Sequence, residues 1–376
     1  MKEWNVEICD VTLRDGEQTP GVSFSCEEKV RIAEMLDEIG VEVIEAGFPI
    51  VSPYEKRCVS AIAHMDMDAR VCALARARRA DIEAAVDCDV DMVSIFIATS
   101  DLHIRHKYRK PREQVLAESL EMVDLAKEHG LQVRFAAEDA SRTDFSFLTD
   151  VYRGAEEHRA DYLSFADTVG FLTPIEMHGI MERLISIFRT PLCAHCHNDL
   201  GFASANTIAA AQAGAFQLHT TVNGIGERAG NAALEEVLVA LYLKGGVKRY
   251  KLALLTELSR MVMHYSGVEV DILKPVVGEN AFRHESGIHI AAILEDPETY
   301  EVFPPSLVGG ERRFILGKHT GKKALEHELA RLGYQLPEEQ VCRVLELVKD
   351  RGEKKAELTD EILVDMIKLV TEGAPS

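Results

Sequence analysis

Several features of exported and membrane proteins are missing from this sequence of 376 residues. The first residues, MKEWN, lack the apolar core of a secretory signal, and no uninterrupted apolar run is long enough to span a bilayer. The eight cysteines are scattered through expected strands and helices rather than spaced as a disulfide framework, which fits a reducing compartment. We therefore expect a cytoplasmic protein.

Positive charge is also scarce. The chain carries 42 Lys and Arg residues against 62 Asp and Glu residues, which gives a formal net charge of −20 at pH 7. A chain this acidic is repelled by nucleic acid and by anionic membrane surfaces, so we expect neither as a partner. An anionic small-molecule substrate would need a local cationic site.

Alternation of apolar runs with helical patterns organises the chain. Hydrophobic residues make up 47% of it, enough for a large core, and the length suggests one large domain and a smaller one. Apolar, β-branched runs that predict strands cover residues 6–13, 41–46, 69–73, 92–97, 132–137, 162–166, 191–197 and 216–222. Helical patterns lie between them, for example at residues 27–39, 111–129, 174–188 and 201–213. We therefore expect an α/β protein with a (β/α)8 TIM barrel, although a doubly wound sheet shares this alternation.

Polar residues follow most of the predicted strands. Barrel enzymes carry their active-site groups just after the strands, at one mouth of the barrel. The polar positions are residues 14–18, Glu45, Thr99, Ser100, Glu138, Asp139, Asp167, Thr168, His195, His197 and residues 223–231. The sequence thus predicts a polar site at this mouth.

The stretch CAHCH at residues 193–197 holds two histidines two positions apart. In a strand, this spacing puts both imidazoles on one face, where they could ligate a metal ion. Two other interpretations fit the same letters: the C-x-x-C-H signature of c-type haem, which belongs to exported electron carriers, and a pair of core histidines that only satisfy hydrogen bonds. With Asp15 and Asn231, His195 and His197 would make an open site that could accept Zn²⁺, Mg²⁺ or Mn²⁺.

Four motifs carry a resemblance to a known family. They read DVTLRDGEQ at residues 10–18, HCHND at 195–199, NGIGERAGN at 223–231 and HESGIH at 284–289. In this order they resemble the metal-dependent acyl-CoA condensing barrels, which include 2-isopropylmalate, citramalate and homocitrate synthases, and the similarity runs nearly end to end. The stretches EAGFPIVS at 45–52 and FIATS at 96–100 are most similar to the homocitrate synthases of methanogens.

The resemblance implies a metal centre. Asp15, His195 and His197 would hold the divalent ion, with Asn231 adjacent to it or linked through water. The ion would polarise the ketone of a 2-oxo acid so that a carbon nucleophile can attack it.

The resemblance also implies the residues that handle the two substrates. Arg14 would face the ketone oxygen, Gln18 of the same motif would be a further substrate contact, and Thr168 would bind the carboxylate of the 2-oxo acid. Glu138 and His289 would together remove a proton from the methyl group of acetyl-CoA, the co-substrate.

Simpler explanations exist for the same residues. Arg14 and Asp15 could be a solvated ion pair, and Glu138 or Thr168 could cap a helix. The sequence also departs from the family at Cys193, which alone creates the likeness to a haem signature.

Arg134 is the candidate for substrate choice. In its predicted strand it lies on the same face as Glu138, inside the barrel. A buried guanidinium needs a carboxylate partner, either a structural one such as Glu45 or Asp167 or the distal carboxylate of a substrate. Because an arginine fork suits bidentate carboxylate capture, we expect 2-oxoglutarate to be preferred over a branched 2-oxo acid. Ala136 stands where relatives often carry serine, which removes a possible hydroxyl contact.

A change in composition marks the end of the expected catalytic barrel, residues 1–270. Residues 271–376, which include KPVVG at 274–278 and His289, read as linker subdomains. In the family this segment crosses to the partner subunit and completes its active site, so the resemblance implies an obligate homodimer. It also implies no regulatory domain after the helices beyond Pro337, and so no leucine feedback through one.

The leading hypothesis is condensation of acetyl-CoA with 2-oxoglutarate to homocitrate and CoA, by an acyltransferase of amino-acid biosynthesis. Within the same chemistry, the alternatives are 2-isopropylmalate synthase, which uses 2-oxoisovalerate, and citramalate synthase, which uses pyruvate. From other classes, the alternatives are a metal-dependent aldolase or lyase and a c-type haem electron carrier.

Overall fold

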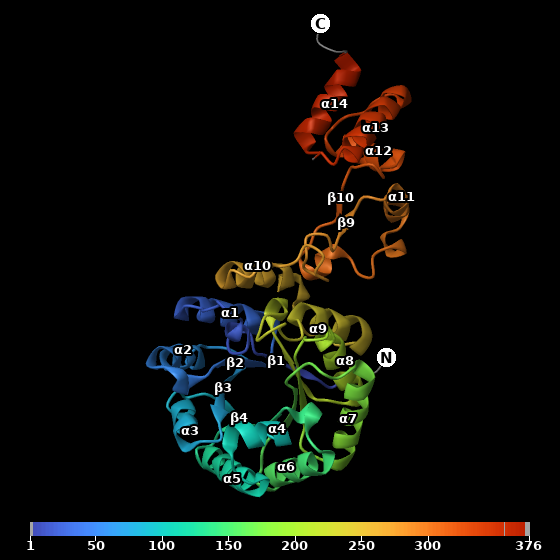
Figure 1. Ribbon diagram of the computed structural model, residues 1–376. Helices are drawn as coiled ribbons and strands as arrows, with labels where there is room; N and C mark the ends of the chain where they lie inside the picture. Colours follow the sequence, from blue (N-terminus) through green and yellow to red (C-terminus); the bar gives the residue numbers. More distant parts are fainter. Residues whose placement is uncertain (1–2, 357, 373–376) are drawn as a thin grey trace. The chain divides into compact units, whose positions relative to one another are not determined.

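The computed structural model describes residues 3–356 and 358–372. Two compact units, Met1–Val270 and Asp271–Ser376, make up the chain. In the first, eight parallel strands form a closed barrel in sequence order, and β1 pairs with both β2 and β8 (Figure 1). The strands are β1 Glu7–Asp10, β2 Val43–Gly47, β3 Arg70–Arg76, β4 Met92–Ala98, β5 Gln132–Glu138, β6 Tyr162–Asp167, β7 Leu192–Cys196 and β8 Gln217–Thr220. The predicted (β/α)8 barrel is confirmed, and the doubly wound alternative is wrong because β1 and β8 close the sheet.

Helices surround the strands as an outer ring (Figure 1). The helices of the first unit are α1 Cys26–Ile39, α2 Pro53–Ala63, α3 Arg79–Val86, α4 Asp101–His103, α5 Arg112–Glu128, α6 Phe145–Glu157, α7 Pro174–Ile187, α8 Ala203–Ala213, α9 Leu234–Ala240 and α10 Leu255–Ser266, and all but α4 belong to the ring. Local sequence sets their ends. Ser25 and Glu28 form a capping box at the start of α1, and Gly40 ends it in a left-handed conformation with φ of 99°. Short helical turns are η1 Gly16–Gln18, η2 Pro49–Val51, η3 Ile104–Tyr108, η4 Ala140–Arg142, η5 Val222–Gly224, η6 Leu241–Gly245 and η7 Leu252–Leu254.

The segment after β4 differs from the other connections. α4 runs directly into η3, a turn of π-helix, and α4 is drawn inside the ring of outer helices (Figure 1). Because it follows the carboxyl end of a strand, this segment belongs to the mouth of the barrel at which the functional residues were predicted.

The first strand is shorter than predicted. β1 ends at Asp10 rather than at residue 13, because the N–H groups of Arg14, Asp15 and Gly16 all donate to the carbonyl of Val11 at 3.2, 2.8 and 3.1 Å. This turn replaces further strand pairing, and it fixes the direction in which Arg14 and Asp15 leave the barrel wall.

Apolar and polar layers alternate inside the barrel. One layer is a cluster of buried apolar side chains: Cys9, Val11, Val43, Cys72, Met92, Tyr162 and Cys193. Next to it Arg134 of β5 and Glu45 of β2 are buried, and the Arg134 guanidinium contacts Cys9 and Cys72 of the cluster. A barrel of eight strands is just wide enough for its side chains to fill, so these inward residues form a packed floor below the mouth.

The second unit has its own core. Its strands are β9 Arg283–His284 and β10 Arg313–Phe314, and its helices are α11 Gly287–Glu295, α12 Lys322–Arg331, α13 Glu338–Glu353 and α14 Asp360–Glu372, with turns η8 Pro297–Thr299 and η9 Pro305–Val308. Leu325, Val344, Val348 and Ile367 lie at the centre of an apolar cluster formed by α12 to α14. None of the helices in the described part of the chain has both the length and the apolarity that a membrane crossing requires.

Candidate active site

A cavity of about 280 Å³ lies at the carboxyl ends of the barrel strands. Its walls include most of the residues that the sequence predicted for the site: Arg14, Asp15, Gln18, Arg134, Glu138, Thr168, His195 and His197. They lie in or shortly after β1, β5, β6 and β7, which are far apart in the sequence. Closure of the barrel therefore brings them together at one mouth.

The two histidines point to the same place. His195 is the fourth residue of β7 and His197 follows the strand, so the strand alternation turns both rings to one face. Their Nε2 atoms lie 3.2 Å apart, and both side chains are buried. Burial is the main cause that lowers the pKa of both imidazoles, to well below the usual value for His195. Both rings are therefore neutral at pH 7, which is the form that ligates metal ions.

Asp15 completes this group. Its Oδ2 lies 3.6 Å from His195 Nε2 and accepts from Arg14 Nη1 at 2.6 Å, while its Oδ1 accepts from Asn231 Nδ2 at 2.8 Å. Burial acts to raise the pKa of Asp15, but the opposing influences, of which the charge of Arg14 is the largest, outweigh it and hold this pKa below its usual range. The carboxylate is therefore ionised.

The group fits a divalent metal ion. One ligand atom each from Asp15, His195 and His197 can be chosen so that all lie within 4.8 Å of one another. An ion that binds its ligands at about 2.0–2.2 Å would fill this space. His197 Nδ1 and Asn231 Oδ1 are buried and have no hydrogen-bond partner within the described part of the chain. Core histidines and amides that serve only packing are normally satisfied, so these two orphaned atoms favour a ligand or ordered water here.

Arg14 links the metal-ligand group to the floor of the barrel. Its Nε pairs with Glu45, whose other oxygen pairs with Arg134. Two arginines and two carboxylates thus alternate in the order Arg134, Glu45, Arg14, Asp15. Arg14 Nη2 makes no hydrogen bond to any residue that the structure describes, so it remains available to a ligand in the cavity.

Arg134 has a structural partner. Its side chain is 1% exposed, it pairs with Glu45, and it donates to Gln217 Oε1 at 2.8 Å and to Ser94 Oγ at 3.1 Å. Of the partners left open by the sequence, the structure therefore supplies Glu45 and not Asp167. The guanidinium still lines the cavity, so a contact with substrate stays a prediction.

Glu138 is the last residue of β5, and its two carboxylate oxygens differ in their contacts. Oε1 forms an ion pair with Lys107 and lies 3.8 Å from His103 Nδ1. Oε2 is buried without a hydrogen-bond partner among residues 3–356 and 358–372. Thr168 uses its hydroxyl to accept the N–H of Asp139 at 2.8 Å and also lines the cavity. Neither residue is a simple helix cap, since neither starts a helix.

His289 belongs to the second unit. It lies in α11, where its ring stacks on Tyr300 with ring centroids 4.0 Å apart. That His289 helps Glu138 to remove the methyl proton of acetyl-CoA therefore stays a prediction.

Sequence reasoning missed several residues of the cavity wall, and His219 is the most prominent. It lies in β8, buried, with its ring centroid 5.4 Å from that of His195, and burial followed by the charge of Arg134 lowers its pKa well below the usual value. The period of two along β8 could have identified it, because Gln217 and His219 share the inward face. The other missed positions are Leu74, Ser94, Phe96, Ser164 and Ala166, whereas Glu227 and Arg228 belong to the polar stretch 223–231 that was predicted for the mouth.

The haem interpretation is wrong. Cys193 and Cys196 are both buried within β7, and burial raises the pKa of Cys196 to about 12. Thioether attachment needs two accessible and reactive thiols, which this wall of a barrel does not offer.

Comparisons with known proteins agree with this geometry. The family described as HMGL-like matches residues 5–262, and the family described as homocitrate synthase post-HMGL domain-like matches residues 276–356. The homocitrate synthase AksA of Methanosarcina acetivorans is 53% identical over 97% of this chain and 91% of its own. A probable 2-isopropylmalate synthase of Methanopyrus kandleri is 49% identical over 93% of this chain and 70% of its own.

Among solved structures, the HMG-CoA lyase of Bacillus subtilis superimposes with a TM-score of 0.65 at 21% identity, covering 72% of this chain and 97% of that one. This likeness shows the barrel fold alone. The family resemblance read from the four motifs is confirmed, since the HMGL-like match spans more than half of the chain and the relatives align nearly end to end. The chain belongs to the HMGL-like family, in the group that holds the homocitrate and 2-isopropylmalate synthases.

Proposed function

We propose that this protein condenses acetyl-CoA with 2-oxoglutarate and water to give homocitrate and CoA, with a divalent metal ion bound at Asp15, His195 and His197. The observation that carries the proposal is the single cavity that joins this donor group to Arg14 and to the free oxygen of Glu138. The relatives named homocitrate synthase support the choice of product.

The 2-oxo acid would bind through residues on one side of the cavity. Thr168 would bind its C1 carboxylate, and Gln18 would be a further contact. Arg14 Nη2 would donate to the ketone oxygen, which becomes an alkoxide when the new carbon–carbon bond forms. A bound divalent ion would supply Lewis-acid polarisation of the same ketone. Asn231 would hold Asp15 in place through the hydrogen bond to Oδ1.

Acetyl-CoA would lose a methyl proton on the opposite side. Glu138 Oε2 is the free acceptor in the cavity, so it would take the proton as the methyl carbon attacks the ketone carbon. His289, contributed by the partner subunit of a homodimer, would complete this base. Hydrolysis of the resulting CoA thioester then releases CoA with a free thiol, and makes the condensation effectively irreversible.

The choice among 2-oxo acids depends on the floor of the cavity. Arg134 would share its charge between Glu45 and the distal carboxylate of 2-oxoglutarate. A second candidate, 2-isopropylmalate synthase, has an observation in its favour. Glu45 already neutralises Arg134, and Leu74, Phe96 and Ala136 give the cavity an apolar wall that could accept a branched tail.

A panel of 2-oxo acids offered with acetyl-CoA tests the proposal. Thiol release is followed with a thiol reagent, and the organic acid product is identified by mass spectrometry. We expect the highest kcat/KM with 2-oxoglutarate. Better turnover of 2-oxoisovalerate or pyruvate would transfer the assignment to the second candidate or to citramalate synthase, and no acetyl-CoA-dependent thiol release with any acid would contradict both.

A further inference from the structure

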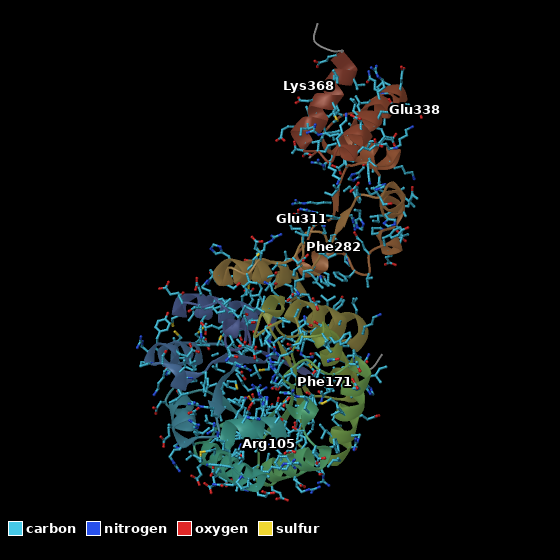
Figure 2. The ribbon with its side chains drawn as sticks, viewed as in Figure 1. Arg105, Phe171, Phe282, Glu311, Glu338 and Lys368 are labelled. Carbon is cyan, nitrogen blue, oxygen red and sulfur yellow. The ribbon has the colours of Figure 1, made fainter. Side chains whose placement is uncertain are left out.

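A strongly basic segment follows β4 in this acidic protein. Residues 102–112 contain five Lys or Arg residues and no Asp or Glu, in a chain whose formal net charge is −20. The segment runs from the second residue of α4 through the π-helical turn η3 to the start of α5 (Figure 1), and Asp101 precedes it. Figure 2 labels Arg105 on this part of the barrel unit. Such a local reversal of charge is a candidate anion site.

Three of the five cations in this segment are neutralised by ion pairs within the protein. Lys107 pairs with Glu138, Lys110 with Glu118 and Arg112 with Asp101.

Arg105 and Arg109 are exposed, and so is Arg78 in the connection between β3 and α3. Within residues 3–356 and 358–372, these three guanidinium groups make no ion pair and no hydrogen bond. They are therefore free to bind an anion, in contrast to the paired cations beside them.

A second cavity of about 280 Å³ lies between these two basic connections. Its walls combine cations with apolar and aromatic side chains: Arg76, Arg78, Lys107, Phe96, Tyr108 and Val115. Phe96 and Glu138 also line the first cavity, so the two cavities meet at the proposed base. A ligand whose reactive end sits at Glu138 could thus extend away from the metal ligands into this second space.

We propose that Arg78, Arg105 and Arg109 bind the phosphate groups of coenzyme A, with its pantetheine arm in the second cavity. The inference rests on the proposed function, because the thioester methyl must lie beside Glu138 to lose its proton. The arm is uncharged and partly apolar, which suits Phe96 and Tyr108, whereas the 3′-phosphate and diphosphate are strongly anionic and suit guanidinium forks. The segment also raises the local concentration of an anionic co-substrate near an otherwise repulsive surface.

The test compares two thioesters in a triple variant, Arg78→Gln, Arg105→Gln and Arg109→Gln. Acetyl-CoA carries the phosphates, and S-acetylpantetheine lacks them. We expect the KM for acetyl-CoA to rise at least about tenfold, the scale of one or two lost charge-assisted contacts. The KM for the 2-oxo acid and all constants with S-acetylpantetheine should change less than about twofold, because those ligands do not reach the segment.

A control variant removes the same charge elsewhere. Arg31, Arg153 and Arg189 are exposed on the barrel unit away from both cavities, and replacing all three by Gln should leave the KM for acetyl-CoA unchanged. An unchanged KM for acetyl-CoA in the first variant, or an equal loss with both thioesters, would overturn the phosphate site.

Calorimetric binding of CoA separates this inference from the proposed function. If the wild-type protein shows no acetyl-CoA-dependent thiol release, the proposed function fails, yet binding of CoA can still be measured. Weaker binding in the Arg78, Arg105 and Arg109 variant than in the control variant then supports the site. Equal binding in the two variants, or none in the wild-type protein, overturns it.

Discussion

The Nε2 atoms of His195 and His197 lie 3.2 Å apart, with a carboxylate oxygen of Asp15 3.6 Å from the first. A hydrogen bond between the rings would use one of these nitrogens as a donor and would not explain why the Asp15 carboxylate is held beside them by Arg14 and Asn231. A divalent ion would use both nitrogens as acceptors and the carboxylate as a third ligand. The relationship therefore favours a metal centre over a pair of core histidines.

Loss of either histidine should lower the metal content. Replacing His195 or His197 by Ala removes one of few protein ligands, so we expect turnover to be abolished and bound metal to fall well below one ion per chain. Metal analysis after gel filtration measures this, and added metal should raise the Tm of the wild type but not of the variants. His158→Ala, on the outer helical layer, is the control. Full metal occupancy in both variants would contradict the assignment of His195 and His197 as metal ligands.

Gly226 should be essential for the metal centre although it carries no ligand. A Cβ at this position would lie 2.1 Å from Asn231 Nδ2 and 2.9 Å from Asp15 Oδ1. Gly226→Ala must therefore displace the Asn231–Asp15 hydrogen bond, and we expect metal affinity to fall by about 10–100-fold, as for other residues that orient metal ligands. Gly179→Ala in α7 is the matched control, because its Cβ would meet nothing within 4 Å. Equal metal affinity in both variants would show that the hydrogen bond does not position Asp15.

His289 should act on a neighbouring subunit. His289→Ala should bind the 2-oxo acid nearly normally but fail to exchange the methyl protons of acetyl-CoA with solvent, which proton NMR measures. Mixing it with inactive His195→Ala should restore part of the activity, since a mixed dimer contains one site with both histidines intact. Unchanged exchange would remove His289 from the mechanism, and active His289→Ala homodimers would do the same.

Arg134 should decide substrate preference more than overall activity. Arg134→Leu removes a charge at the cavity floor but leaves Glu45 paired with Arg14. We expect kcat/KM for 2-oxoglutarate to fall about 10²-fold or more, and kcat/KM for 2-oxoisovalerate to fall less. Arg134→Lys keeps the charge without the fork and should lie between the two proteins. An equal fall with both substrates, accompanied by a lower Tm, would mean that Arg134 only stabilises the barrel.

The barrel could be predicted because its signal is repeated. Eight apolar runs separated by helical patterns left little freedom for the topology, and the strand alternation placed His195 and His197 correctly. The end of β1 was missed because it depends on three N–H groups that converge on Val11, an arrangement of the turn rather than of residue type.

The sequence could predict most of the residues that line the site, but it could not predict which of them form ion pairs with one another. The partner of Arg134 is set by which inward side chains of different strands meet, and Glu45 lies 89 residues away. The ion pair between Lys107 and Glu138 likewise joins the connection after β4 to the end of β5, which no local pattern relates. His219 was missed for another reason, since a single histidine in a short strand carries no motif.

The hydrogen bond between Asn231 and Asp15 spans 216 residues, from the turn after β1 to the connection after β8. Asn231 can therefore hold Asp15 only after the last strand has docked beside the first. During synthesis, a growing chain that has emerged only as far as β7 would carry both histidines but lack the restraint that aims Asp15 at them. We therefore expect tight ion uptake only once the ring of strands is complete, so that metal capture would report a late step of folding.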